Sequence, residues 1–171
     1  MIAPSELIIN ADGSCFHLHL KPGQLADKVV MCGDPGRVDL IASFFDSREC
    51  EVSSREFHTI TGTYHGKRIT ALSHGIGPDN IDIVMNELDA LGKGADMVMA
   101  CGPMPMLRAI AAYADPQKID AYISLEERMA CGVGACLGCI TKTKEVDHHS
   151  YVNNTRICTD GPVFKTTVLD I

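Results

Sequence analysis

The sequence has no tryptophan, no excess of positive charge and no long apolar run. Its 171 residues include 15 lysines and arginines against 22 aspartates and glutamates, which gives a net charge of −7. A protein that binds the phosphate backbone of nucleic acid needs a basic face, so this balance disfavours a nucleic-acid partner. No apolar run approaches the ~20 residues that span a bilayer, and the start of the chain lacks the basic segment and apolar core of a secretory signal. We therefore expect a cytoplasmic protein without a membrane segment.

Cysteine, by contrast, is abundant, and its eight residues are unevenly spaced. Four lie singly along the chain, at Cys15, Cys32, Cys50 and Cys101. The other four crowd the C-terminal end, at Cys131, Cys136, Cys139 and Cys158. In a reducing compartment such residues are more typical of free thiols and a metal site than of four disulfides. The chain is 46% apolar, and its length fits one ordinary domain or two small ones.

Strand and helix patterns alternate along the chain. An apolar, β-branched run over 28–33 predicts a strand, and Asp34-Pro35 after it predicts a helix start. We expect that helix to bury Val38, Leu40, Ile41, Phe44 and Phe45. Further strands are predicted over 57–64 and 67–73 (a hairpin turning at His65-Gly66), 95–101, 121–124, 139–142 and 165–169, and helices over 79–91 and 106–114. The alternation predicts an α/β front half, and the glycine- and cysteine-rich run over 129–139 predicts a small loop-rich module behind it.

The strongest motif is the cysteine cluster, which reads C-x4-C-x2-C from Cys131 to Cys139, with Cys158 further on. This is the spacing of plant-type 2Fe–2S ferredoxins. Three thiolates on one tight loop reach a small anionic cluster from one side, and a fourth from a distant segment closes the cage. The residues between them are mostly small, so the backbone approaches closely and points N–H groups at the sulfurs. The motif therefore predicts a 2Fe–2S cluster held by Cys131, Cys136, Cys139 and Cys158.

A structural zinc site is the alternative interpretation of the same cysteines, with His148 and His149 as possible further ligands. Such sites usually combine two C-x2-C pairs, and only one occurs here. Disulfides would require an oxidising compartment. The spacing thus favours the iron–sulfur cluster.

This region also resembles a known family. The stretches Gly94–Leu107, Ser124–Cys139 and Ile157–Phe164 are similar to the C-terminal part of the electron transfer subunit of dihydroorotate dehydrogenase B, over about residues 94–171. In that family, which serves pyrimidine biosynthesis, FAD receives electrons from NADH, and a 2Fe–2S cluster passes them singly to FMN in the catalytic subunit. The resemblance implies an FMN-containing dihydroorotate dehydrogenase catalytic subunit as partner.

The resemblance also implies roles for particular residues. It makes the four C-terminal cysteines the cluster ligands, and it places Cys101, Gly102 and Pro103 near a nicotinamide. For Cys101, a buried small residue at a strand end is the alternative. The family's FAD-binding barrel and most of its nucleotide-binding domain have no counterpart in this chain, so no flavin site is assigned. We expect residues 94–124 to be a remnant of the pyridine-nucleotide domain and residues 125–171 to be the cluster-binding domain.

The front half carries a weaker motif, Gly33-Asp34-Pro35-Gly36-Arg37, where a strand is expected to meet a helix. Glycine lets the backbone approach a ligand, the N–H groups of a helix start favour an anion, and Arg37 adds a fixed positive charge. The motif suits phosphate, and a plain capped turn is the alternative.

A second family resemblance covers about residues 1–91. The stretches Phe16–Leu20, Cys32–Val38, Ser54–Phe57 and Ser73–Pro78 are similar to the opening of the uridine phosphorylase branch of the nucleoside phosphorylases. Those enzymes are cytoplasmic homo-oligomers that cleave the glycosidic bond of a nucleoside with phosphate.

This second resemblance implies that Gly33 and Arg37 bind phosphate, that Arg55 reaches the phosphate of a neighbouring subunit, and that His17 reaches a neighbour's ribose. It also implies a homo-oligomer formed through the front half. In the family, another phosphate arginine and threonine follow on the next strand and loop, and later segments build the ribose and base pockets. This chain departs from that pattern after Leu91.

The two resemblances meet near Leu91–Gly94, and a natural gene fusion, a constructed chimera and an error of sequence assembly would each give such a chain. Three functions follow. The first is one-electron transfer by the C-terminal cluster, which the complete motif favours. The second is phosphate-dependent nucleoside cleavage, for which the groups that orient both substrates are incomplete. The third is an inactive fusion fragment that folds partially and exposes apolar surface. The sequence favours an electron-transfer component over a complete enzyme.

Overall fold

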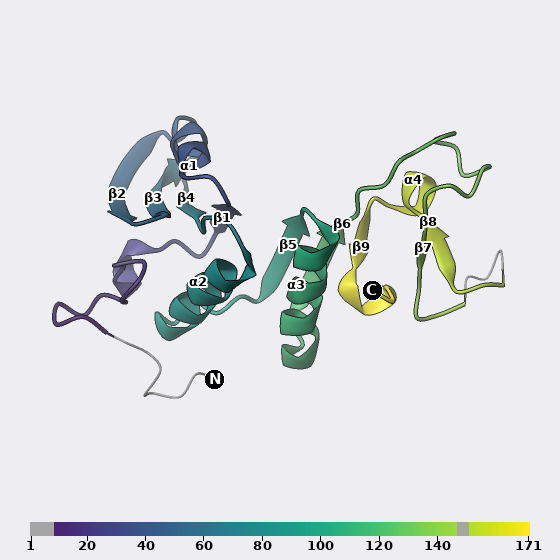
Figure 1. Ribbon diagram of the computed structural model, residues 1–171. Helices are drawn as coiled ribbons and strands as arrows, with labels where there is room; N and C mark the ends of the chain where they lie inside the picture. Colours follow the sequence, from purple (N-terminus) through teal and green to yellow (C-terminus); the bar gives the residue numbers. More distant parts are fainter. Residues whose placement is uncertain (1–8, 147–150) are drawn as a thin grey trace. The chain divides into compact units, whose positions relative to one another are not determined.

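Residues 9–146 and 151–171 are described in the computed structural model (Figure 1). Contacts divide the chain into two units, one ending at Gly94 and the other beginning at Ala95. Among the described residues, no helix combines the length and the apolar character needed to cross a membrane. The mixed α/β front half and the loop-rich end of the chain confirm the predicted fold class.

The front unit is built on a four-stranded sheet in the order β1-β4-β3-β2. Strand β1 (Val29–Cys32) pairs in parallel with β4 (Lys67–Ser73), and β3 (Phe57–Tyr64) pairs antiparallel with both β4 and β2 (Ser47–Ser54). The hairpin between β3 and β4 turns at His65-Gly66, whose φ angles of 46° and 71° give the tight left-handed turn that a two-residue hairpin loop requires. These strands and this turn confirm the sequence prediction for β1, β3 and β4.

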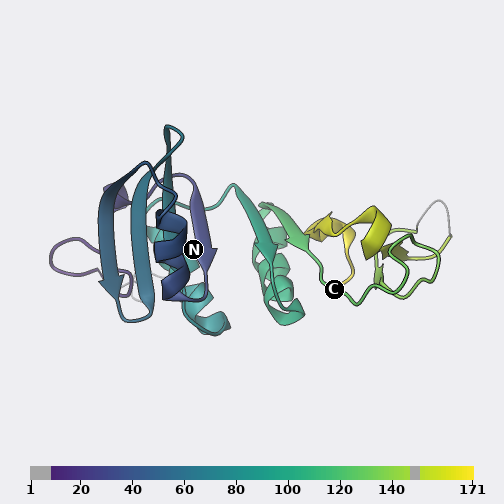
Figure 2. The ribbon, with the colours of Figure 1, turned by 90° about the horizontal axis from the view of Figure 1, so that it is seen from above.

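Each face of this sheet carries its own core. Helix α1 (Pro35–Ala42) lies across one face, where its Val38 and Ala42 meet Ile60 and Ala71 of the sheet (Figure 2). Helix α2 (Pro78–Ala90) packs on the other cluster, in which Val84 and Leu88 join Leu18, Leu20, Leu25, Phe57 and Leu72. Because side chains alternate along a strand, β3 supplies Phe57 to one core and Ile60 to the other.

Helix α1 begins as predicted but buries fewer residues than expected. The Asp34 carboxylate caps it by accepting a hydrogen bond from the Gly36 amide at 2.9 Å, with Pro35 in the first turn. The prediction that Leu40 and Phe44 are buried is wrong, because their side chains are 62% and 66% exposed. The helix ends at Ala42; Val38 and Ala42 are buried against the sheet, and the predicted Ile41 and Phe45 are partly buried beside them.

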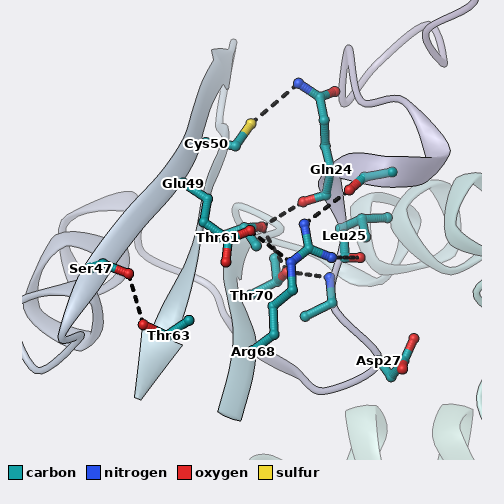
Figure 3. Close-up of polar contacts among 12 residues, drawn as sticks. Gln24, Leu25, Asp27, Ser47, Glu49, Cys50, Thr61, Thr63, Arg68 and Thr70 are labelled. Carbon is teal, nitrogen blue, oxygen red and sulfur yellow. Dashed lines mark hydrogen bonds and ion pairs between the residues drawn. The ribbon is translucent and has the colours of Figure 1, made fainter. Parts of the chain in front are cut away.

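A network of hydrogen bonds joins the segment before β1 to this sheet (Figure 3). The Arg68 guanidinium donates to the carbonyl oxygens of Leu25 and Gly23 at 2.7 and 2.9 Å and to the Glu49 carboxylate at 2.7 Å. The buried Thr70 hydroxyl accepts from the Ala26 amide at 2.9 Å and lies 2.8 Å from the Thr61 hydroxyl. The short 3₁₀ turn η1 (Pro22–Gln24) is thereby held at the sheet by groups from two neighbouring strands.

The back unit begins with a parallel strand–helix–strand unit. Strands β5 (Met97–Cys101) and β6 (Asp120–Ser124) pair in parallel, and α3 (Met104–Gln117) connects them. Strand β9 (Val163–Lys165) pairs antiparallel with β6, and the 3₁₀ turn η2 (Thr166–Val168) follows. The core contains Leu107, Ile123, Leu125, Cys139, Ile157, Phe164 and Leu169.

The rest of the back unit is a loop over 125–139, followed by a small two-stranded sheet. Strand β7 (Ile140–Lys142) pairs antiparallel with β8 (Asn154–Arg156), and the one-turn helix α4 (Ile157–Asp160) follows directly. The predicted strand over 165–169 is wrong beyond Lys165, because the chain there turns and the Leu169 amide donates to the Thr166 carbonyl. Strand β8 and helix α4 carry no clear sequence pattern.

Candidate metal centre and anion cleft

Three of the four C-terminal cysteines lie on the loop between β6 and β7. The loop makes repeated left-handed turns, with positive φ at Gly132, Gly134 and Leu137. These turns let a short stretch double back on itself, so that its amides point inward. Cys139 at the end of the loop is 3% exposed, whereas Cys136 is exposed. The loop therefore presents its sulfurs at different depths.

Backbone N–H groups of this loop are directed at its sulfurs, as the sequence predicted. The Cys136 amide donates to the Cys131 sulfur, and the Gly138 amide donates to the Cys136 sulfur, each at 3.4 Å. The pKa of the Cys131 thiol is lowered to about 6, first by the Cys136 amide and then by the Val133 amide and the Cys136 thiol. The local backbone thus stabilises a thiolate, which is the form that ligates metals.

The fourth cysteine is brought to the loop by the β7–β8 sheet. Ile140 stands opposite Arg156 in that sheet, and the Ile157 amide donates to the Cys139 carbonyl at 2.9 Å. Cys158 follows at once. The pKa of its thiol is raised, first by hydrogen bonding with the Cys139 thiol and then by burial, while the Gly134 amide lowers it. The Cys158 thiol therefore lies beside the Cys139 thiol, as the Cys131 thiol lies beside the Cys136 thiol.

This pairing bears on the kind of metal centre. Over residues 9–146 and 151–171, no three side chains of His, Cys, Asp or Glu gather closely enough to hold a single ion. A tetrahedral zinc site needs four donors around one ion, whereas a 2Fe–2S cluster spreads four thiolates over two irons. Which of these two centres the four cysteines hold stays a prediction. His148 and His149, named above as possible zinc ligands, lie outside the described residues.

The residues expected near a nicotinamide lie at the end of β5 and the start of α3. Pro103 precedes the first turn of the helix. Cys101 is exposed, and its thiol lies 3.8 Å from a carboxylate oxygen of Glu126, so the alternative of a buried small residue is wrong. The carboxyl ends of parallel strands are where α/β sheets bind ligands. The assignment of Cys101, Gly102 and Pro103 stays a prediction.

In the front unit, the β1–α1 junction borders a cleft of about 600 Å³. Its lining brings Gly33 and Arg37 together with Glu56, Gly75 and Asn80. The Asn80 amide group donates to the Glu56 carboxylate at 3.0 Å. Sequence reasoning missed Glu56 and Asn80, because the turn between β2 and β3 and the start of α2, which bring them into contact, are 24 residues apart.

Arg55 and His17 are engaged elsewhere in the front unit. The Arg55 guanidinium lies over the Phe16 ring, 5.9 Å from its centre, and Arg55 is not among the residues that line the cleft. The His17 ring nitrogen Nδ1 lies 2.7 Å from the Glu87 carboxylate. The sequence resemblance assigns both residues to a neighbouring subunit's site, and that assignment stays a prediction.

Comparison with known families gives two separate matches. Residues 126–170 match the family model described as the iron–sulfur cluster binding domain of dihydroorotate dehydrogenase B. Residues 27–103 match the model of the phosphorylase superfamily. Both resemblances noted from the sequence are thereby confirmed, and the chain combines parts similar to two unrelated families.

Curated relatives carry the name of the first family. The electron transfer subunit of dihydroorotate dehydrogenase B (NAD(+)) from Caldanaerobacter subterraneus is 51% identical over 82 residues, which are 48% of this chain and 32% of that protein. The same subunit from Bacillus mycoides is 35% identical over 122 residues, which are 71% of this chain and 40% of that protein. The chain thus spans about a third of the length of the first of these relatives.

Solved structures match the front half. A uridine phosphorylase from Phytophthora capsici is 31% identical with a TM-score of 0.50, covering 55% of this chain and 33% of that one. A Trypanosoma brucei nucleoside phosphorylase with uridine phosphorylase activity is 46% identical with a TM-score of 0.49, covering 50% and 27%.

The two similarities overlap at the centre of the chain. The phosphorylase match continues to residue 103, beyond Gly94, and the Bacillus mycoides match is longer than the whole stretch after Gly94. A strand followed by a turn and a helix is common to α/β families, and β5 with the start of α3 is such a unit. The position of the join near Leu91–Gly94 therefore stays a prediction.

Proposed function

We propose that the back unit binds a 2Fe–2S cluster through Cys131, Cys136, Cys139 and Cys158 and transfers single electrons. The observation that carries this proposal is the β7–β8 pairing, which brings Cys158 to the cysteine loop through the Ile157–Cys139 hydrogen bond. The match to an iron–sulfur domain over residues 126–170 supports it independently.

The chain's own residues have definite tasks in this function. When bound, the cluster supplies one-electron chemistry at a potential set by its surroundings. The thiolates of the two cysteine pairs hold it, and the amides of Cys136 and Gly138 direct N–H groups at their sulfurs, which offsets negative charge. Buried Cys139 anchors the inner side, whereas exposed Cys136 lies on the side open to a redox partner.

The partner is inferred from the relatives. They are named as electron transfer subunits of an NAD(+)-dependent dihydroorotate dehydrogenase, so we infer an FMN-containing catalytic subunit in the cytoplasm as electron acceptor, with FAD and NAD as upstream cofactors. This chain spans only part of those relatives, and no group of described residues is assigned to FAD. A flavin supplied by another chain would complete the path.

Iron and acid-labile sulfide analysis after anaerobic reconstitution tests the proposal. We expect two irons and two sulfides per chain, a brown colour and an EPR signal on reduction. Cys136→Ser should lose most of this iron, whereas Cys50→Ser, which changes a cysteine of the front unit, should retain it. A colourless parent protein, or one that binds a single zinc ion instead, would refute the iron–sulfur assignment.

A second candidate function rests on the front cleft. Gly33 and Arg37 stand together at the N-terminus of α1, where backbone N–H groups and a guanidinium favour an anion. We propose weak binding of phosphate there, with nucleoside phosphorolysis as the activity of a front-half homo-oligomer in which Arg55 and His17 serve a neighbouring site. Titration with inorganic phosphate, followed by amide NMR shifts at Gly33, should saturate in the parent and weaken at least tenfold in Arg37→Ala. The absence of an NMR shift in the parent would refute phosphate binding. The absence of uracil released from uridine would refute the phosphorolysis activity.

A further inference from the structure

Next to Cys158, the Asp160 carboxylate forms the centre of a hydrogen-bonded clasp. It accepts from the Arg156 backbone amide at 2.9 Å and from Nε and Nη2 of the Arg156 guanidinium, each at 3.1 Å. The hydroxyls of Thr155 and Thr159 add two further bonds at 3.1 Å. One carboxylate therefore joins the end of β8 to the single turn of α4 on either side of Cys158.

The clasp fixes the direction of the Arg156 guanidinium. Two of its nitrogens bind the two oxygens of Asp160, which is the planar two-point geometry that lysine cannot reproduce. The arginine side chain is 35% exposed, so its charge is only partly screened by water. A cation held in this way acts on its surroundings as a charge at a constant position.

The clasp lies directly against the cysteine loop. A methyl group placed on Gly134 would stand 3.3 Å from Nη1 of Arg156 and 3.1 Å from the Thr159 side chain. Gly134 has a φ of 77° and lies between Cys131 and Cys136 in the loop. Both backbone conformation and space therefore require glycine at this contact, and the guanidinium reaches the part of the loop that separates two of the proposed ligands.

We propose that the charge of Arg156, with Asp160 as its positioning residue, raises the reduction potential of the cluster; this inference rests on the proposed iron–sulfur function. Four thiolates make the centre anionic, and reduction adds one more negative charge to it. A cation fixed beside the loop attracts the reduced form more strongly than the oxidised form. Asp160 contributes by holding the guanidinium against Gly134.

The test is a one-electron redox titration of the reconstituted full chain, with dithionite as reductant and the visible spectrum as readout. In Arg156→Gln we expect the ratio of reduced to oxidised cluster at a fixed potential to fall about tenfold, which equals 59 mV for one electron. The matched control is Arg108→Gln, which removes the same charge from the exposed side of α3 and should leave the ratio unchanged. The ratio of reduced to oxidised cluster in Arg156→Lys should lie between the ratios of the parent and of Arg156→Gln.

Asp160→Asn separates charge from positioning. Loss of the negative charge of Asp160 alone would raise the reduction potential of the cluster, whereas release of the Arg156 guanidinium would lower it. We expect Asp160→Asn to have a lower potential than the parent. A higher potential in Asp160→Asn would overturn the role of the clasp, and equal potentials in Arg156→Gln and Arg108→Gln would overturn the inference as a whole. If Arg156→Gln does not load a cluster, an Arg156→Lys potential equal to the parent's overturns it instead. A parent protein without cluster would refute the proposed function first, and the inference with it.

Discussion

Glu87 of α2 is a charged residue in the core of the front unit, where its side chain meets the segment before η1. It is 5% exposed, and its carboxylate accepts hydrogen bonds from the amides of His17 and Leu18, each at 2.9 Å. Burial opposes ionisation of Glu87, but the Leu18 amide, the Cys15 thiol and His17 outweigh it and hold the pKa of the carboxyl below its usual value. The ionised carboxylate thus ties two segments together.

We predict that Glu87→Gln lowers the free energy of unfolding of the front unit by about 2 kcal/mol, because an amide leaves one of the two buried N–H groups facing a donor. Since the folded-state pKa is lowered, the ionised group contributes fully above its unfolded pKa near 4.5 and loses its contribution as pH falls through the folded value. The difference between parent and variant should therefore shrink below about pH 4.5. Urea unfolding followed by circular dichroism at several pH values measures it.

The control for this prediction is Asp82→Asn, which removes the same charge from the exposed side of the same helix. It should cost less than about 0.5 kcal/mol. Equal losses in the two variants would contradict the role assigned to Glu87.

At the scale of single residues, the sequence identifies the candidate ligand cysteines but gives no sign of the contact that Glu87 makes. The C-x4-C-x2-C spacing is local and specific to one kind of centre, so Cys131, Cys136 and Cys139 are visible in a short stretch. A glutamate on an amphipathic helix is ordinarily solvent-facing, and its partner His17 lies 70 residues away. Nothing near Glu87 in the sequence signals that contact.

Among the elements, β4 shows how polar side chains stabilise a sheet from within. Thr70 is fully buried, and its hydroxyl serves both the Ala26 amide and the Thr61 hydroxyl (Figure 3). We predict that Thr70→Val, which has nearly the same shape, lowers the free energy of unfolding by about 2 kcal/mol, since it leaves the Ala26 amide buried without an acceptor. Amide hydrogen exchange should show faster exchange at Ala26.

Thr63→Val on β3 is the matched control for this element. The Thr63 hydroxyl also makes a hydrogen bond, to Ser47 at 2.7 Å, but at an exposed position where water replaces it. A loss below about 0.5 kcal/mol is expected. A Thr70→Val protein as stable as this control would show that the hydrogen-bond network around η1 contributes little to the free energy of unfolding.

The elements also show where sequence patterns stop being informative. Strand β3 is rich in β-branched and aromatic residues, and the His65-Gly66 turn joins it to β4, so the pattern predicts this hairpin. Strand β2 (Ser47–Ser54) consists mainly of polar residues at the edge of the sheet, with only alternate positions partly covered, and it forms because β3 offers it a partner. Helix α1 packs on the sheet through Val38 and Ala42, with Ile41 partly buried beside them, whereas Leu40 is exposed, so sequence alone assigned too wide a face.

For the whole molecule, the central fact is that the buried clusters are separate in the two units: two lie in the front unit and one in the back unit. Ile60 belongs to the core beneath α1, and Ile123 belongs to the core of the back unit; neither is exposed. The sequence predicted two parts from two resemblances, and contacts divide the chain at Gly94. How complete each part is could not be read from either pattern, because a core depends on contacts between segments far apart. Both units nevertheless leave large apolar side chains uncovered, among them Phe44 and Met99 at 66% and 75% exposure.

Because the two units share no buried cluster, they lead to a prediction about cooperativity. We expect calorimetry of the full chain to show two unfolding transitions. Ile60→Ala should lower the midpoint of only one transition and Ile123→Ala that of only the other. Each substitution should lower the free energy of unfolding of its unit by about 3 kcal/mol, because it removes buried methyl groups and leaves a cavity in one core. Reconstitution with iron and sulfide should raise the midpoint temperature of only the transition that Ile123→Ala affects, since a ligand stabilises the unit that binds it. A single transition that responds to both substitutions would mean that the chain folds as one unit, and the cluster would then stabilise the phosphorylase-like half as well.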